Sequence, residues 1–261
     1  MITATARAAV LDIEGTTGSA AHVYEVLFPY ARVRLADWFA SHRDDPRHGE
    51  LLAEVGEATG TAVDEAGAVA ALTAWADADV KAAPLKRLQG LIWSEGFADG
   101  TLTGHVYPDV PPALLRWRAA GIDCYVYSSG SVTAQRDWFG RSNEGDLSGL
   151  LRGHFDLANA GAKTEAASYR SITRAIGTPP HLTVFLSDRV GELDAAAAAG
   201  WRTVAVRRPE DPSTPMGEHP LVSALDQIRL TAPAPDPVPA PAPAGPTGPG
   251  SPTPRDEDSR S

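Results

Sequence analysis

The stretch VLDIEGTT, residues 10–17, decides how the rest of the chain is read. An apolar run, Ala8–Leu11, ends in Asp12; Glu14 follows two positions on, and Gly15 then permits a sharp turn. A carboxylate at the end of a buried strand is costly unless it is neutralised, and strand side chains at positions i and i+2 point the same way. A divalent cation would neutralise such a pair, while the freed N–H groups of the turn would face an anion. The stretch therefore indicates a metal-assisted site for an anionic group; the competing interpretation is a capping acid beside a surface acid.

Strand-like and helix-like segments alternate along most of the chain. The strand-like runs are Ala8–Asp12, Ile122–Ser128, Leu182–Asp188 and Thr203–Val206. The helix-like stretches between them are Pro111–Ala120, Ser131–Phe139, Glu165–Ile176 and Gly191–Ala199. Asp109 is a candidate cap before a proline-containing first turn, and Gly121, Gly177 and Gly200 stand where helices should end. This alternation predicts an α/β fold, a Rossmann-like parallel sheet with helices on both faces.

One long segment interrupts the alternation directly after the first strand. From residue 20 to residue 105, apolar side chains recur at helical spacing, beginning with Val23 and ending with Phe97. We therefore expect a catalytic core of residues 1–19 and 106–230 and an inserted helical cap of residues 20–105. Ligands of open α/β sheets bind at the carboxyl ends of the strands. The cap would form a lid there, which can exclude water and select the substrate.

The composition changes at the C-terminal end of the chain. Residues 231–261 are rich in Pro, Ala and Gly and contain no apolar residue larger than Val. Such a segment cannot bury enough surface to offset its chain entropy, so we expect a disordered tail. An inert tail and a polyproline II ligand for a partner domain are both compatible with this composition.

Charge and cysteine content restrict the partners and the compartment. The net charge of -10 disfavours nucleic acid, because a protein that binds the phosphate backbone presents a basic face. Cys124 is the single cysteine, which suits a reducing compartment. Asp12 interrupts the N-terminal apolar run before it reaches signal-peptide length, and no run approaches the ~20 apolar residues of a membrane span. We expect a cytoplasmic protein that does not bind membranes.

Two further strand ends bring polar groups to the same edge of the predicted sheet. One strand leads into Ser128 and Ser129 and then a helix, an arrangement that can bind an oxyanion through hydroxyls, N–H groups and the helix dipole. Ordinary N-capping by Ser131 is the alternative. Another strand ends at Asp188, a candidate metal ligand. Glu192, in the next helix's first turn, is either a supporting residue of the site or simply favourable at a helix N-terminus.

A lysine supplies the candidate cation. Lys163 lies just before a predicted helix in GAKTE, residues 161–165. It does not belong to a P-loop, because no glycine stands at the required upstream spacing. A lone lysine is also compatible with a solvated surface charge. The 7 histidines form no zinc motif such as His-Glu-x-x-His.

Four elements follow one another along the chain: the DIEGT stretch, a strand that ends at Ser128, then Lys163, and a strand that ends at Asp188. Together they resemble the haloacid dehalogenase-like phosphotransferase superfamily. Glu14 is informative, because most of that superfamily carries aspartate there. Longer motifs across residues 7–210 resemble, more closely, the enolase-phosphatase E1 (acireductone synthase) family. They are LDIEGTT (11–17), LFPY (27–30), YVYSSGSVTAQ (125–135), GHFD (153–156) and FLSD (185–188).

The resemblance implies a monomeric hydrolase of methionine salvage with one Mg²⁺ per chain. Such an enzyme enolises 2,3-diketo-5-methylthiopentyl-1-phosphate and then removes the phosphate to leave the acireductone. By the same resemblance, Asp12 is the nucleophile and a metal ligand, and Glu14 takes the acid/base position and offers a ligand through its backbone carbonyl. Asp188 is then the third protein ligand of the metal. The remaining roles are substrate-phosphate binding by Ser128 and Ser129, and charge compensation by Lys163.

Three positions depart from the pattern of that family. Gly18-Ser19-Ala20 stands where Thr-Pro-Ile is expected, and Arg141 and Ala162 each stand where histidine is expected. We expect residues of the cap and the loop after Thr17 to line the diketone end of the site. A Mg²⁺-dependent phosphatase of the same fold for another small phosphate ester is therefore a second hypothesis. A third, of another class, is a non-catalytic protein that recruits partners through its proline-rich tail.

Overall fold

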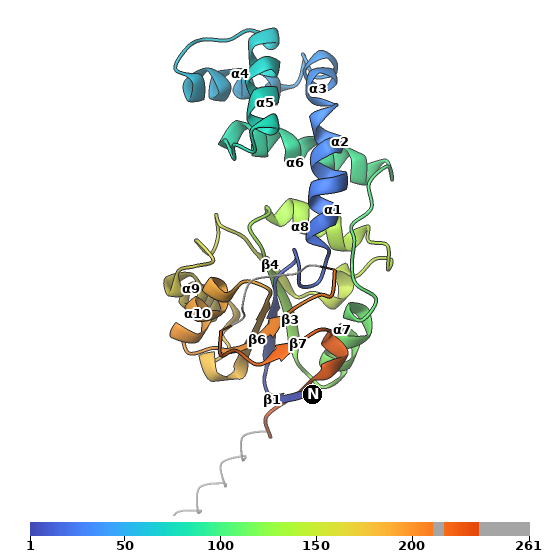
Figure 1. Cartoon of the computed structure of the whole chain (residues 1–261), viewed down its shortest axis with the longest axis vertical. Helices are drawn as coiled ribbons and strands as arrows, with labels where there is room; N and C mark the ends of the chain where they lie inside the picture. Colours follow the sequence, from blue (N-terminus) through green and yellow to red (C-terminus); the bar gives the residue numbers. More distant parts are fainter. Residues whose placement is uncertain (211–216, 235–261) are drawn as a thin grey trace, which may run out of the picture.

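A parallel sheet of six strands forms the centre of the protein, whose computed structural model describes residues 1–210 and 217–234 (Figure 1). In spatial order its strands are β4 (Gly153–Phe155), β3 (Asp123–Tyr127), β2 (Ala8–Leu11), β5 (Thr183–Ser187), β6 (Arg202–Val206) and β7 (Leu221–Val222). A separate parallel pair joins the two ends of the described chain: β1 (Ile2–Thr5) and β8 (Ile228–Thr231). The predicted Rossmann-like α/β fold is confirmed. The run Ala8–Asp12, which was predicted as the first strand, is β2 in the structure, because the short strand β1 precedes it.

Helices cover both faces of the sheet because its strands are buried on both sides. Alternate residues of β2 enter different cores: Ala9 and Leu11 pack with one cluster, and Ala8 and Val10 with the other. The first cluster takes residues from α7 (Val110–Ala119) and α8 (Val132–Gly140). The second takes residues from α9 (Ala166–Ile176) and α10 (Val190–Ala198). The first residues after the central strands therefore emerge between two helical layers.

The segment after β2 forms a group of helices that stands apart from the sheet (Figure 1). These are α1 (Ala20–His22), the π-helical turn η1 (Val23–Leu27), α2 (Phe28–Arg32), α3 (Leu35–Ser41), α4 (Pro46–Thr59), α5 (Glu65–Asp77) and α6 (Ala83–Ala98). They have a core of their own, with Trp38, Leu72 and Leu88 among its buried residues. Three short 3-10 turns complete the described elements: η2 (Ser148–Leu150), η3 (Pro180–Leu182) and η4 (Leu225–Gln227).

The helix ends follow the sequence in part. Gly121, Gly177 and Gly200 have positive φ angles of 76°, 66° and 85° at the ends of α7, α9 and α10, as predicted. Asp109 is the N-cap residue of α7 and prolines stand in the first turn, as predicted, but its side chain makes no capping hydrogen bond. Its carboxylate binds the buried guanidinium of Arg208 instead. A buried ion pair outweighs a cap because an unpaired buried arginine would be far more costly.

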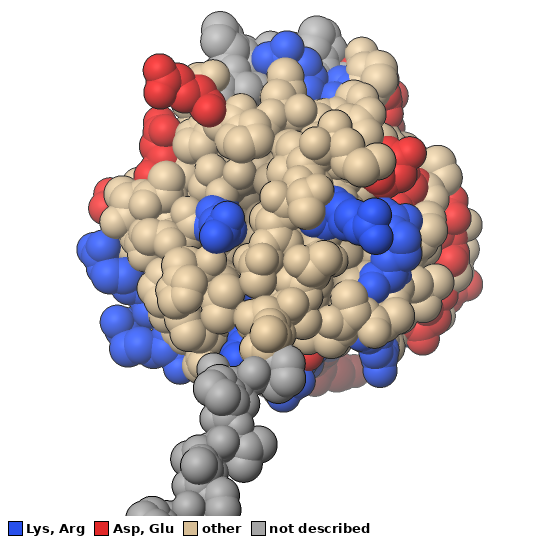
Figure 2. Space-filling view, turned by 90° about the horizontal axis from the view of Figure 1, so that it is seen from below, with Lys and Arg blue, Asp and Glu red and all other residues tan. Residues whose placement is uncertain are grey.

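The expectation that the protein does not bind nucleic acid stays a prediction, and one face of the described surface bears on it. Figure 2 shows the end of the molecule opposite the cap helices; it is largely uncharged, with basic and acidic side chains in separate places. A nucleic-acid binder would present a continuous basic patch. Among the described residues, no helix is both long and apolar enough to cross a membrane. Thr231, where the predicted tail begins, still pairs with Thr5 in the β1–β8 sheet; residues 235–261, and with them most of the predicted tail, lie outside the described residues.

Candidate active site

The turn after β2 presents Asp12 at the carboxyl edge of the sheet. Asp12 is 4% exposed, and its Oδ1 accepts a hydrogen bond from the Ile13 backbone N–H at 2.8 Å. The backbone N–H groups of residues 16, 17 and 18 all donate to the carbonyl of Ile13, which closes a tight turn. Within it, Gly15 has a φ of 70°, and a Cβ there would lie 2.7 Å from Asp188 Oδ2. Only glycine fits this position, so the turn and Asp188 are packed as one unit.

Lys163 forms an ion pair with Asp12 in the interior of the protein. Lys163 Nζ lies 2.5 Å from Asp12 Oδ1 and 2.7 Å from Glu192 Oε2. Burial disfavours the ammonium charge, but Asp12 and Glu192 outweigh that cost, and the pKa of Lys163 is raised. The Tyr169 hydroxyl donates to the Lys163 carbonyl at 2.8 Å and fixes the backbone beneath the side chain. Lys163 is therefore a buried, protonated partner of Asp12 and no surface charge.

Glu192 belongs to the same network of charged side chains, so its role is not limited to a favourable position at a helix N-terminus. The Ser187 hydroxyl lies 2.9 Å from Glu192 Oε2 and 3.3 Å from Asp12 Oδ2. Burial, with Asp12 nearby, raises the pKa of Glu192 to about 7. Glu192 is thus a second carboxylate partner that helps to hold the Lys163 ammonium group in place.

Asp188 has the properties of a ligand that awaits a cation. Its Oδ1 is buried and has no hydrogen-bond partner among the described residues, which is costly unless another group fills the place. Burial, with Asp12 and Glu192 nearby, raises the pKa of Asp188 to about 7. A divalent cation would reverse this shift by supplying positive charge. Asp188 and Asp12 offer the carboxylate oxygens that Mg²⁺ prefers.

Glu14 follows Asp12 by two positions and faces a different environment. It lines the large cleft of the protein, and burial together with the charge of Asp12 raises the pKa of its carboxyl group. Among the described residues, no group of three or more His, Cys, Asp or Glu side chains could hold a metal. The expected third donor, the backbone carbonyl of Glu14, is not a side chain, so the donor set of two carboxylates and one carbonyl still fits Mg²⁺ together with phosphate and water.

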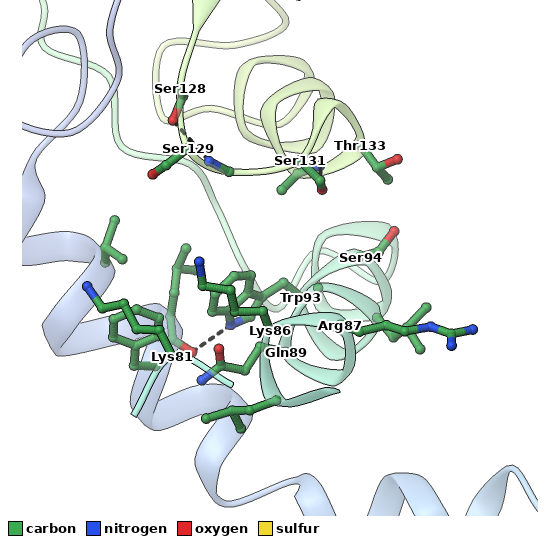
Figure 3. Close-up of a pocket in the computed structure, with 18 of the residues that line it drawn as sticks. Lys81, Lys86, Arg87, Gln89, Trp93, Ser94, Ser128, Ser129, Ser131 and Thr133 are labelled. Atoms are coloured by element: carbon green, nitrogen blue, oxygen red, sulfur yellow. Dashed lines mark hydrogen bonds between the residues drawn. The ribbon is translucent and has the colours of Figure 1, made fainter. Parts of the chain in front are cut away.

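The serine loop after β3 lies across the cleft from the cap helices (Figure 3). Ser128 is buried, its N–H donates to Phe155 O at 3.1 Å, and its Oγ accepts from Gly130 N at 3.3 Å. Ser129 is exposed and lines the cleft. Both serines therefore line the cleft, and their role in binding the substrate phosphate stays a prediction.

The N-terminus of α8 is less available to an anion than expected. Ser131 caps the helix by accepting a hydrogen bond from Ala134 N at 3.2 Å, and Asp156 Oδ2 accepts one from Val132 N at 3.0 Å. Two of the first N–H groups of the helix are thus already satisfied. The alternative of ordinary capping by Ser131 is observed, and the hydroxyls of the serine loop are the better donors for a ligand.

A cleft of about 1340 Å³ separates the cap helices from the core. Glu14, Ser128 and Ser129 contribute to its core side, and Lys81, Lys86 and Trp93 to its cap side (Figure 3). Asp12, Lys163 and Asp188 do not line this cleft. Asp12 and Asp188 follow strand ends, Lys163 lies in the loop before α9, and of the three only Asp188 is half-buried rather than buried. The cleft leads to the charged network through Glu14 and the serine loop.

Sequence reasoning missed a residue that holds the turn after Asp12 in place. Arg208, after β6, donates two hydrogen bonds to Thr16 O, from Nε at 2.9 Å and Nη2 at 2.7 Å. Its Nη1 donates to both carboxylate oxygens of Asp109 at 2.9 and 3.0 Å, and its guanidinium lies 4.1 Å from the ring centroid of Tyr107. No local sequence pattern distinguishes this arginine. Because it follows another arginine, its sequence context is typical of a charged residue on the surface.

None of the three departures from the family pattern lines the cleft. Gly18 packs so closely that a Cβ would lie 2.5 Å from His105 O and 2.7 Å from Trp138 Cζ2. Arg141 donates to Asp137 on the surface at 3.1 Å, and Ala162 is exposed at the start of the Lys163 loop. Gly18 packs against Trp138, and the Ser19 N–H donates to His105 Nδ1 at 3.1 Å, so neither lines the cleft; the expectation that the loop after Thr17 lines the diketone end stays a prediction.

Comparison with known proteins agrees with this geometry. A family model described as haloacid dehalogenase-like hydrolase matches residues 6–200, and the chain belongs to that class of hydrolases. Enolase-phosphatase E1 of Frankia alni is 51% identical over 228 residues, which is 87% of this chain and 97% of that protein. Enolase-phosphatase E1 of Streptomyces avermitilis is 54% identical over 204 residues, 78% of this chain and 85% of that protein. Within the class, the chain is a member of the enolase-phosphatase E1 family.

Solved structures support the same fold. The UTR4 protein of Saccharomyces cerevisiae is 31% identical, with a TM-score of 0.73 over 85% of this chain and 100% of that one. CbbY of Rhodobacter sphaeroides, solved with xylulose-(1,5)bisphosphate, has a TM-score of 0.56 at 18% identity, over 85% of this chain and 96% of that one. At that identity the likeness concerns the fold alone.

Proposed function

We propose that this protein is a bifunctional enolase-phosphatase of methionine salvage. It converts 2,3-diketo-5-methylthiopentyl-1-phosphate to acireductone, 1,2-dihydroxy-3-keto-5-methylthiopentene, and phosphate. The observation that carries the phosphatase half is the buried contact between Lys163 Nζ and Asp12 Oδ1 at 2.5 Å, beside a cleft edged by Glu14, Ser128 and Ser129. The assignment of the enolase half follows from membership of the enolase-phosphatase E1 family.

Asp12 is the nucleophile in this proposal. One carboxylate oxygen attacks phosphorus in line, the bond from phosphorus to the ester oxygen breaks, and an aspartyl-phosphate forms. Water then attacks the phosphorus and releases phosphate and the free carboxylate. Lys163 holds Asp12 in place and offsets negative charge on the transferred group, and the hydroxyls of Ser128 and Ser129 donate to its oxygens.

Glu14 serves as the acid/base group of the phosphatase step. Burial and Asp12 raise the pKa of its carboxyl group, which favours a form that can give a proton to the leaving oxygen. The carboxylate left behind can then accept a proton from the attacking water. Asp12 and Asp188, with the backbone carbonyl of Glu14, are the residues that would hold one Mg²⁺, which when bound neutralises charge on the phosphate.

The domain division belongs to the same proposal. Residues 1–19 and 106–230 form the catalytic core, and residues 20–105 form a cap that covers the site and excludes water during phosphoryl transfer. We propose further that the protein acts as a cytoplasmic monomer and that its partner is a small phosphorylated diketone, without nucleic acid or membrane.

Turnover of the diketo phosphate with Mg²⁺ tests the proposal. The ultraviolet absorbance of the enol and the released phosphate are followed in one sample, and both should appear, the enol first. A product that keeps its phosphate would refute the proposal. Hydrolysis of another phosphate ester without any enol would favour the second hypothesis, a phosphatase with a different substrate; the departures at Gly18, Arg141 and Ala162 give it little support, because none of them lines the cleft.

The third hypothesis, a binding protein that acts through its tail, has a separate test. Residues 235–261 lie outside the described residues, so the structure does not bear on the tail's partners. Deletion of the tail should leave turnover of the diketo phosphate unchanged. A loss of cellular function with turnover intact would support the binding protein.

A further inference from the structure

Gln89 is a buried polar side chain of the cleft that has no partner in the described part of the protein. It is 7% exposed and lines the cleft from α6. Its carboxamide makes no hydrogen bond to any described residue. Its oxygen and nitrogen are not among the fully buried atoms without a partner, so the carboxamide keeps some access to the cleft. Gln135, by contrast, is 1% exposed and donates to Gly130 O and Phe155 O, both at 2.8 Å. A buried amide without a partner is costly, so Gln89 is poised for a ligand.

The neighbours of Gln89 on α6 show what kind of ligand group it would meet. Leu85, Gln89 and Trp93 are four residues apart and share the face of the helix that lines the cleft. The indole N–H of Trp93 is already used, because it donates to Leu27 O at 2.7 Å (Figure 3). The amide therefore lies between apolar neighbours on its own helix face, with Lys81 and Lys86 also on the cap side. A hydrogen bond from a buried group discriminates strongly between ligands.

The chemistry of the amide favours an uncharged oxygen. A carboxamide offers two N–H donors and one carbonyl acceptor and carries no charge. A phosphate would be bound better by the serine hydroxyls or by Lys81 and Lys86, which also line the cleft. A ketone accepts a hydrogen bond, and the enol formed from it donates one. A single carboxamide can satisfy both forms.

We propose that Gln89 binds the carbonyl oxygens of the substrate and makes the enzyme select phosphate esters that carry a ketone next to the phosphorylated carbon. This proposal rests on the proposed function and assigns Gln89 as a specificity-determining residue. The cleft of about 1340 Å³ exceeds the ~300–1,000 Å³ of ordinary small-molecule sites. In this proposal the cap approaches the serine loop when substrate binds, and α6 carries Gln89 with it.

A pair of substrates that differ only at the ketone tests the proposal. Phosphate release is measured for 2-oxopentyl phosphate and pentyl phosphate, both with Mg²⁺, in the full chain and in Gln89→Leu and Gln89→Met. The wild-type enzyme should prefer the ketone by about tenfold or more in kcat/KM, and both variants should lose most of that preference while pentyl phosphate hydrolysis stays within about twofold. Gln227→Leu is the matched control, because Gln227 lies away from the cleft and binds Ser223 Oγ at 3.1 Å.

Two results would overturn the proposal. The first is a ketone preference that is absent from the wild type or unchanged in Gln89→Leu. The second is an equal loss on both substrates with a lowered melting temperature, which would make Gln89 a packing residue; removal of a buried amide without a partner should leave the melting temperature unchanged or higher. Failure of the proposed function is a different observation, the absence of an enol signal from the diketo phosphate in the wild type.

Discussion

Lys163 Nζ lies 2.5 Å from Asp12 Oδ1 although the two residues are 151 positions apart, and both side chains are buried. Glu192 lies 2.7 Å from the same ammonium group. One cation thus balances two carboxylates within the core, and the lysine contributes to the stability of the fold as well as to the chemistry of the site.

Replacement of Lys163 by Met should destabilise the protein strongly. The change leaves Asp12 and Glu192 buried together without a cation, and loss of one partner of a buried pair costs about 3–5 kcal/mol. The free energy of unfolding from urea titrations measures this. Arg32→Met is the matched control, because the Arg32–Asp77 pair is 36% and 59% exposed, and an exposed pair contributes about 1 kcal/mol or less. Equal losses in the two variants would refute the argument.

Asp12→Asn should remove phosphate release with little change in the fold. The amide cannot form the aspartyl-phosphate, so turnover should fall by about 10³-fold or more. Lys163 keeps Glu192 as a charged partner at 2.7 Å, so the variant should remain folded. Phosphate release and circular dichroism, with the exposed Asp226→Asn as control, are the measurements. Substantial turnover in Asp12→Asn would contradict the assignment of the nucleophile.

Mg²⁺ should raise the melting temperature in a saturable manner. Asp188 Oδ1 is buried without a partner among the described residues, and a cation bound there stabilises only the folded state, by about 2.7 kcal/mol at 100 times its dissociation constant. Scanning calorimetry with increasing Mg²⁺ at constant ionic strength tests this. Asp188→Asn should abolish most of the effect; an unchanged Mg²⁺ dependence in that variant would place the metal elsewhere.

Two glycine-to-alanine variants separate backbone strain from steric overlap. Gly15 and Gly60 have similar φ angles of 70° and 74°, but a Cβ on Gly15 would lie 2.7 Å from Asp188 Oδ2, whereas one on Gly60 meets nothing within 4 Å. Gly60→Ala should cost about 1 kcal/mol, the backbone cost alone, and Gly15→Ala about 1–3 kcal/mol more. Urea unfolding of both variants gives the comparison. Indistinguishable values would mean that Asp188 moves freely away from the turn.

Cys124 should make the protein less stable at alkaline pH. Burial raises the pKa of its thiol to about 12, whereas an unfolded thiol ionises near about 8.5. Between these values the folded state keeps a proton that the unfolded state loses, so the stability due to this group falls as pH rises from about 8.5 towards 12. Unfolding free energies at pH 8, 9 and 10 should decline less steeply for Cys124→Ala. Parallel slopes would show that the thiol ionises freely in the folded protein.

The sequence predicted the long strands and helices because each carries a readable pattern. The apolar runs that became β2, β3, β5 and β6 each end within a residue or two of the predicted bound, and glycines at 121, 177 and 200 end the helices. The strands that it missed are short or lie at the edges. β7 has two residues and β4 has three, too few to show a period.

The candidate site likewise contains residues that the sequence could identify and contacts that it could not. Asp12, Ser128 and Asp188 could be found because each directly follows a buried strand, and parallel strands bring their carboxyl ends to one edge. Their roles in binding and catalysis stay predictions. The partnership of Lys163 with Glu192 and the clamp of Arg208 on Thr16 depend on contacts between distant segments. No local pattern reports such contacts. The sequence placed Asp109 correctly at the start of α7, but it could not show that the carboxylate binds Arg208.

The Arg208–Thr16 contact also has a consequence for the order in which the chain is synthesised and becomes functional. The two residues are 192 positions apart, so at about 5–20 residues per second the ribosome needs about 10–40 s to add the arginine after Thr16 has been made. A nascent chain that already contains the cap and most of the core still lacks the group that fixes its catalytic turn. We infer that activity is gained late in translation, and that a chain truncated before residue 208 is born without it.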